Sequence, residues 1–230
     1  MVVVNDASTD GTQTILEEYK ARDARVRVVT NEKNLGLTKS LNRGILASTG
    51  EYVARMDNGD ISYPTRFEKQ VAFLDVNPEY CMVGSFANFT NDNSEVIGQL
   101  KYSTSHEDIS RGLIRHNLFI HSSVMMRRDV LERVGLYNEN WRYAQDYELF
   151  FRMIQIGKVA NIPEVLVSYR ISEESITKSK NKKQVMFAIR ARYEAIKREQ
   201  YSVLSLVFLV PPFIGYLVPY GLKQTIKKIF

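Results

Sequence analysis

Short apolar runs alternate with longer amphipathic segments over the first 80 residues of this chain. The pattern predicts strands at 2–4, 26–29 and 51–56 and helices at 12–22, 38–47 and 64–76. Strands separated by helices of this length favour a parallel sheet with right-handed crossovers. Acidic turns follow the first and third of these strands, at Asp6 and Asp57. Since ligands of open α/β sheets bind at the carboxyl ends of strands, we expect both turns to share one rim.

The pattern is less regular from residue 80 onwards. It predicts strands at 80–89, 95–102, 122–126 and 165–170, and helices at 106–115, 128–134, 146–156 and 180–198.

Residues 202–220 are nearly all apolar but contain Pro211, Pro212, Gly215 and Pro219. A membrane-spanning helix needs about 20 apolar residues, and prolines disfavour one straight span. We therefore expect a membrane-surface or re-entrant segment. The alternative is a helix pair packed on the core or on a second subunit.

The composition is that of a globular protein, with 230 residues, 44% hydrophobic and 25% charged. The net charge of +5 is concentrated near the C-terminal end, which suits an anionic membrane surface or a solvated helix face. The basic helix carries few aromatics, Phe187 and Tyr193, and no base-reading motif appears, so we do not expect a nucleic-acid partner. The single cysteine, Cys81, and the lack of a secretory signal pattern favour the cytoplasm, at the inner face of the cell membrane.

Five stretches, in order and spacing, resemble the family 2 glycosyltransferases, which are inverting enzymes of the GT-A fold. The stretches are VVVNDASTDGT (2–12), NEKNLGLTKSLNRGILASTGEYVARMDNGDIS (31–62), HSSVMMRRDVLERVGLYNE (121–139), AQDYELFFRM (144–153) and YRISEESIT (169–177). The resemblance implies an α/β fold with a mostly parallel, mixed sheet flanked by helices. It places the glycosyltransferase domain at 1–177 and leaves a basic helix and a membrane-associating segment at 178–230.

The resemblance assigns several residues to the nucleotide-sugar donor. Asp6 falls on the second acid of the family's Asp-Asp-Gly-Ser turn, which is assigned to the nucleobase. Asn34 and Gly36 lie between a strand and a helix, where glycine permits a tight turn or a close backbone approach. Lys39 lies in the first helical turn, where the helix dipole disfavours a cation, so it either meets a phosphate or is simply solvated.

The acidic cluster at 57–60 departs from the family pattern Asp-x-Asp-Asp, whose second acid binds Mn²⁺ or Mg²⁺. Here that position is Gly59, and Ser172 stands where some members have a metal-binding histidine. Asp57 is expected to serve the ribose or a weakened metal site, and Asp60 is the remaining metal-ligand candidate. Because hard cations need oxygen ligands, we expect Mg²⁺ or Mn²⁺ to bind weakly or not at all.

Three explanations of these departures stay open. Arg170 and Lys39 are candidates to neutralise the leaving diphosphate in place of a metal. Alternatively, Asp60 shifts to hold the ion, or catalysis is impaired.

On the acceptor side, Asp146 is the expected general base. Inverting transfer needs a carboxylate that takes the proton of the acceptor hydroxyl. The Gln145-Asp146 pair opens a helix where the family has Glu-Asp, a position that the helix dipole also favours for an acid. His121 and Trp141 are expected in the acceptor region, although each is open to a purely structural role.

The resemblance also implies a further strand and helix before Val2. Without that strand, one edge of the sheet would be unpaired, and we expect another segment or a second subunit of a homo-oligomer to cover it. The resulting prediction is an inverting glycosyltransferase that moves a sugar from a nucleotide-sugar to a glycan or lipid-linked acceptor, in envelope or capsular polysaccharide synthesis. The alternative is a non-catalytic or fragmentary nucleotide-sugar-binding relative with an impaired metal site.

Overall fold

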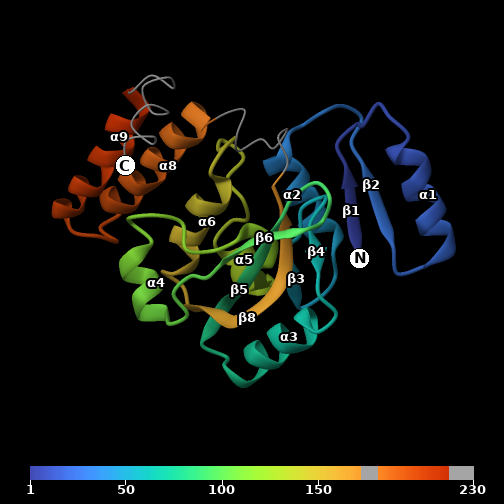
Figure 1. The fold of residues 1–230 in the computed structure, drawn as a ribbon, viewed down its shortest axis with the longest axis horizontal. Helices are drawn as coiled ribbons and strands as arrows, with labels where there is room; N and C mark the ends of the chain where they lie inside the picture. Colours follow the sequence, from blue (N-terminus) through green and yellow to red (C-terminus); the bar gives the residue numbers. More distant parts are fainter. Residues whose placement is uncertain (172–180, 218–230) are drawn as a thin grey trace.

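A computed structural model describes residues 1–171 and 181–217 as an α/β protein with two sheets and helices packed around them (Figure 1). The strands are β1 (Val2–Asn5), β2 (Arg27–Thr30), β3 (Tyr52–Ala54), β4 (Ile61–Ser62), β5 (Tyr80–Thr90), β6 (Val96–Leu100), β7 (Met125–Arg127) and β8 (Lys158–Arg170). The α-helices are α1 (Thr12–Arg22), α2 (Leu37–Ala47), α3 (Arg66–Val76), α4 (His106–Gly112), α5 (Arg128–Arg133), α6 (Gln145–Met153), α8 (Asn181–Lys197) and α9 (Val210–Leu217). Two 3₁₀-helices are η1 (His121–Ser123) and η2 (Val203–Leu209).

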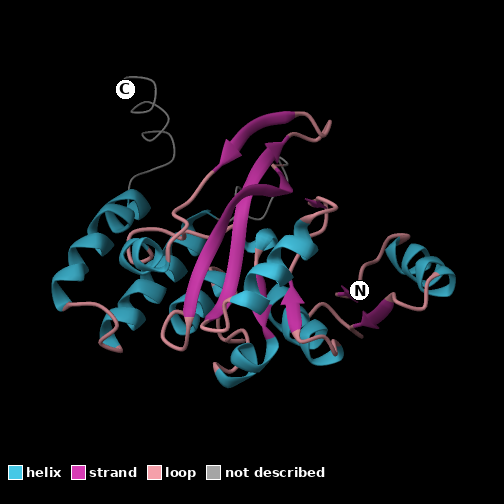
Figure 2. Cartoon of the chain, turned by 90° about the horizontal axis from the view of Figure 1, so that it is seen from below, coloured by secondary structure: helices cyan, strands magenta, loops and turns pink. Residues whose placement is uncertain are grey.

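The first two strands form a small parallel sheet of their own. Val3 of β1 pairs with Val28 of β2, and α1 connects the two strands at one end of the molecule (Figures 1 and 2). The third predicted strand, β3, does not extend this sheet but pairs antiparallel with β7. The single parallel sheet expected from the first 80 residues is therefore wrong. Alternation of elements predicts which segments are strands, but β7 lies some 70 residues downstream and only the folded chain brings it beside β3.

The larger sheet is mixed and has the order β3-β7-β5-β8-β4, with β6 paired to β5. Its centre is the long parallel pair of β5 and β8 (Figure 2), whereas the other pairs are antiparallel. β8 begins at Lys158, seven residues before the predicted start at 165. Its register against β5 shifts around Pro163: Ser85 pairs with Ile162, and the next residue, Phe86, pairs with Val165. This irregularity accommodates Pro163, which cannot donate a ladder hydrogen bond.

Helices cover both faces of this sheet. Leu74 of α3 is fully buried in one cluster with Val83, and α6 lies in the main core through Leu149 and Phe150. α8 packs against α6 and buries Ala191, Ala195 and Ile196 in the same core. The α/β class with a mixed sheet flanked by helices is thus confirmed. The basic helix, predicted as part of an appendage after residue 177, contributes to the core.

The predicted apolar segment begins as η2 and continues as α9, whose first turn accepts Pro211 and Pro212 because the first helical N–H groups need no intrahelical partner. Within residues 1–171 and 181–217, no helix combines the length and apolar character required to cross a membrane. Residues 218–220 of the predicted segment lie outside the described residues.

Candidate active site

Asp6 directly follows β1, and its carboxylate connects the end of that strand to the loop that precedes α2. Its Oδ1 accepts hydrogen bonds from the side-chain amide of Asn31 at 2.6 Å and from the backbone N–H of Leu35 at 2.8 Å, and its Oδ2 accepts one from Gly36 N–H at 2.9 Å. Burial alone raises the pKa of Asp6, but these hydrogen bonds together hold it below its ordinary value. The carboxylate is therefore ionised and positions the loop, with lone-pair capacity left on Oδ2.

Three other residues predicted to bind the donor, Asn34, Gly36 and Lys39, lie on that loop and the helix after it. Gly36 has φ +85°, a conformation that L side chains rarely adopt, and it delivers the chain into α2. Asn34 and Lys39 are exposed, Lys39 in the first turn of α2. The structure thus brings Asp6, Gly36, Asn34 and Lys39 to the amino end of one helix, where backbone N–H groups favour an anion.

Arg55 organises a second group of residues at the end of β3. Its buried guanidinium forms an ion pair with Asp57 and donates to the hydroxyl of Ser122 at 3.1 Å, and its Nε has no hydrogen-bond partner among the described residues. Ser122 in turn donates to a carboxylate oxygen of Asp60, whose other oxygen accepts the backbone N–H of Arg170 at 3.0 Å. Burial raises the pKa of Asp60, only partly offset by these hydrogen bonds.

Gly59 lies between these acids and directly beneath the side chain of Arg170. Gly59 has φ +89°, and a Cβ on it would lie 2.6 Å from Nη2 of Arg170. Antiparallel pairing of β4 with β8, with Ile61 opposite Ser168, sets this register. Within residues 1–171 and 181–217, no three His, Cys, Asp or Glu side chains are grouped to hold a metal ion. Ser172, the second position of the expected metal site, lies outside the described residues.

Asp146 lies half-buried in the first turn of α6, after Ala144 in the strained left-handed conformation at φ +50°. Its Oδ2 accepts a hydrogen bond of 3.0 Å from the side-chain amide of Asn117. Burial raises the pKa of Asp146 above its ordinary value, partly offset by the Tyr147 backbone N–H and the charge of Arg55. The neighbouring Gln145 is buried. A carboxylate with a raised pKa is suited to proton transfer.

His121 and Tyr137 bridge the Arg55 group and the Asp146 helix. The Nε2 atom of His121 and the hydroxyl of Tyr137 are hydrogen-bonded at 2.7 Å, and the imidazole meets the ring of Phe150 edge-on at 6.2 Å. Burial and the charge of Arg55 hold the pKa of His121 well below its ordinary value, so the ring is neutral. The side-chain amide of Asn42 in α2 donates to the backbone carbonyl of Tyr137 at 2.8 Å, which connects this group to α2.

Trp141 belongs to the core. It is 2% exposed, the ring of Phe187 meets it edge-on at 5.6 Å, and the guanidinium of Arg190 lies 4.7 Å from its ring centre. Its backbone carbonyl accepts the hydroxyl of Thr38 at 2.6 Å. In this structure Trp141 therefore packs α8 against the loop before α6, and its ring faces protein on the side where Arg190 lies.

Three residues that sequence reasoning missed join the predicted ones: Arg55, Asn117 and Ser122. Arg55 carried a signal, since it is an arginine at the end of an apolar strand, and Asn117 is a polar residue before the apolar run 118–120. Ser122 carried none beyond its place next to His121. Their hydrogen-bond partners lie 2 to 67 positions away in the chain, and the sequence alone does not show which distant residues are partners.

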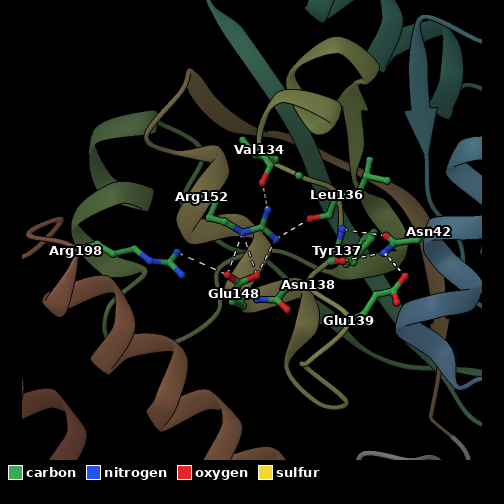
Figure 3. Close-up of a pocket in the computed structure, with 10 residues that line it drawn as sticks. Asn42, Val134, Leu136, Tyr137, Asn138, Glu139, Glu148, Arg152 and Arg198 are labelled. Carbon is green, nitrogen blue, oxygen red and sulfur yellow. Dashed lines mark hydrogen bonds and ion pairs between the residues drawn. The ribbon is translucent and has the colours of Figure 1, made fainter.

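A surface pocket of about 420 Å³ lies beside α6, and its lining includes Glu148 and the two arginines that pair with it (Figure 3). Glu148 is 2% exposed and pairs with Arg152 at 2.7 Å and with Arg198 at 3.7 Å. Arg152 also donates to the carbonyl of Leu136 at 2.7 Å. Glu148 thus pairs with Arg152 on its own helix and with Arg198 just after α8, and these ion pairs connect α6 to the end of α8.

Comparisons with known proteins identify glycosyltransferases as relatives of this chain. A glycosyltransferase from Haemophilus influenzae is 32% identical over 205 residues, covering 85% of this chain and 64% of its own length. The amylovoran biosynthesis glycosyltransferase AmsE of Erwinia amylovora is 37% identical over 153 residues, covering 66% of this chain and 56% of its own. The chain thus spans less than two thirds of the length of these relatives.

Solved structures share the fold. Staphylococcus aureus TarS 1-349 in complex with UDP-GlcNAc superposes with a TM-score of 0.67 at 17% identity, covering 93% of this chain and 63% of that one. The mannosyltransferase PcManGT from Pyrobaculum calidifontis, in complex with GDP-Man and Mn²⁺, gives a TM-score of 0.63 at 15% identity, covering 99% and 69%. Residues 1–135 match the sequence model described as Glycosyl transferase family 2, so this chain belongs to that family.

Proposed function

We propose that this chain is the sugar-transferring part of an inverting glycosyltransferase that uses a nucleotide-sugar donor. The observation that carries the proposal is Asp146, a half-buried carboxylate of raised pKa that Asn117 orients at the start of α6. The charges of Arg55 and Asp57 both act on it, which places it within electrostatic reach of the acidic turn. A base beside a nucleotide-binding rim is what glycosyl transfer requires.

In the proposed step, the oxygen of an acceptor hydroxyl attacks the anomeric carbon of the donor sugar. Its proton passes to the carboxylate of Asp146, and the bond from the anomeric carbon to the diphosphate oxygen breaks. The electron pair of that bond leaves with the nucleoside diphosphate, and the configuration at the anomeric carbon inverts. Asp146 then releases the proton to solvent, so that the base is regenerated.

The donor is proposed to bind with its nucleotide at the loop held by Asp6 and with its diphosphate towards Asp57. The observation in favour is that Asp6 fixes the Leu35 and Gly36 backbone at the amino end of α2, beside the exposed Asn34 and Lys39. Gln145 precedes Asp146 on α6, and His121 contacts Phe150 one turn further along that helix; both are proposed to line the acceptor side. Trp141, being in the core, supports that side from behind.

A glycan or lipid-linked acceptor in surface polysaccharide synthesis is our proposal for the second substrate. AmsE, by its name, acts in amylovoran biosynthesis, and the described tail offers an apolar surface suited to a membrane. The exposed large apolar side chains of η2 and α9 are Val203, Leu204, Leu206, Val207, Val210, Phe213 and Ile214. We propose attachment to the cytoplasmic face of the membrane through this surface.

The Asp146→Asn variant tests the function. With UDP-GlcNAc and GDP-mannose supplied as donors, release of nucleoside diphosphate from the full chain should fall at least about 100-fold, the size expected for lost proton transfer. Donor affinity should stay nearly unchanged. Asp129→Asn, an exposed acid on α5, is the matched control. Donor binding without any release of nucleoside diphosphate by the unmodified chain would instead identify a non-catalytic nucleotide-sugar-binding relative.

A further inference from the structure

We propose that the guanidinium of Arg170 binds the donor diphosphate at the place where a divalent cation would otherwise lie. The proposal deepens the one above and rests on it. Its starting point is that the guanidinium of Arg170 occupies the space beside Gly59: a Cβ at residue 59 would lie 2.6 to 2.8 Å from three atoms of the guanidinium group, so the guanidinium would have to move.

The backbone enforces this contact. Arg170 N–H donates to Asp60 Oδ1, and the β4–β8 ladder begins at Ile61, so Arg170 has little freedom to slide along the turn. Gly59 also has φ +89°, which strains any other residue. The turn is thus built around a missing side chain, and the guanidinium fills that space.

The neighbouring acids are poor metal ligands in this arrangement. Each oxygen of Asp60 already accepts a hydrogen bond, one from Ser122 and one from Arg170 N–H, and Asp60 is only 8% exposed. Asp57 is ion-paired with the buried Arg55. A divalent cation here would lie beside the positive charge of Arg170 with few free oxygen ligands, whereas Mg²⁺ and Mn²⁺ require several. The residues present do not fit the metal that the family resemblance implies.

The same arrangement fits an anion. The Arg170 side chain is exposed, and among the described residues no carboxylate forms an ion pair with its guanidinium. Its planar group of N–H donors matches two phosphate oxygens at once. Because Asp60 holds the backbone N–H of Arg170, the guanidinium already lies over the turn between Asp57 and Asp60 in the absence of a ligand, which reduces the entropy lost on binding.

Calorimetric titration of the full chain with UDP and GDP, and with UMP and GMP, tests the proposal in EDTA and in Mn²⁺. The unmodified chain should bind one of the diphosphates in EDTA, and Mn²⁺ should change the affinity little. Arg170→Ala should weaken that diphosphate about 10- to 100-fold, the range for a lost charge-assisted contact, and leave the matching monophosphate nearly unaffected. Arg170→Lys should lie between the two, because it keeps the charge without the planar fork.

Lys158→Ala is the matched control, because it removes an exposed cation from the other end of β8. A double variant, Gly59→Asp with Arg170→Ala, places a carboxylate in the space that the guanidinium vacated, and its diphosphate binding should become Mn²⁺-dependent. Thermal melts establish that each variant is folded.

Diphosphate binding that EDTA abolishes in the unmodified chain, with Arg170→Ala equal to it in Mn²⁺, would overturn the role of Arg170 and leave the proposed function standing. Failure of the unmodified chain to bind any of these nucleotides, with or without Mn²⁺, would overturn both.

Discussion

The side-chain amide of Asn117 donates a hydrogen bond of 3.0 Å to Oδ2 of Asp146, although the two residues are 29 positions apart. The bond both aims the carboxylate and favours its ionised form, which burial disfavours. Asn117 is in this sense a positioning residue for the proposed base.

Replacement of Asn117 by alanine should therefore move the pH profile of the enzyme. Loss of the donor raises the pKa of Asp146 further, so the acidic limb of the kcat/KM profile should shift to higher pH. At optimal pH we expect kcat to fall about 10-fold, since the misaimed base transfers a proton less efficiently, while KM for the donor stays constant. A lower kcat with an unshifted acidic limb would reduce Asn117 to a structural role.

Asp146→Asn should stabilise the fold at neutral pH. The folded pKa of Asp146 is raised above the ordinary value of 3.8, so the folded state binds this proton more tightly than the unfolded state. Its contribution to stability is therefore present below the unfolded pKa and is lost as pH rises through the folded pKa. Urea unfolding at pH 7 should show a higher midpoint for Asp146→Asn than for the unmodified chain, and the gain should shrink towards pH 4. A variant less stable at pH 7 would contradict the cost that we assign to this buried charge.

Asp6→Ala should loosen the loop before α2. Three hydrogen bonds to one carboxylate are lost, and we expect the free energy of unfolding at pH 7 to fall by about 1–3 kcal/mol, together with loss of nucleotide binding. Because the folded pKa of Asp6 is lowered, its stabilisation is present above 3.8 and is lost as pH falls through the folded pKa, so the two proteins should converge in acid. Glu32→Ala, an exposed acid on the same loop, is the control. A difference that persists unchanged in acid would show that the carboxylate charge is not its source.

The apolar surface of η2 and α9 should bind anionic membranes. Leu204 is 83% exposed and Phe213 is 47% exposed, and α8 next to them carries basic residues. In vesicle co-sedimentation the chain should bind phosphatidylglycerol-containing vesicles, resist release by high salt and yield to detergent. Leu204→Glu with Phe213→Glu should abolish binding, whereas Val76→Glu, an exposed apolar residue on α3, should not. If the double variant instead converts a dimer to a monomer in sedimentation and vesicle binding never occurs, the surface is a contact between copies of this chain.

Much of this protein follows from local sequence. The helices beginning near residues 12, 37, 66 and 145 and the strands at 2–5, 27–30 and 80–90 lie where hydrophobic periodicity predicts them, because backbone propensity and side-chain period act within a few residues. Asp6 and Asp57 follow predicted strands, whereas Asp146 was assigned through the family resemblance, from the Gln145-Asp146 pair that opens a helix. The two departures at Gly59 and Ser172 could also be read from the sequence alone.

The tertiary structure decided which of these segments meet. Strand pairing depends on burial and on contacts between distant segments, so β7 could be placed between β3 and β5 only by the folded chain. For the same reason, only the folded structure shows that Arg55, Ser122 and Asn117 belong to the candidate site, because their hydrogen-bond partners lie on other parts of the chain. Gly59 illustrates the division: the sequence shows that a carboxylate is missing, but only the register of β4 on β8 shows that the guanidinium of Arg170 fills its place. A backbone register is a property of two strands together, and neither strand encodes it alone.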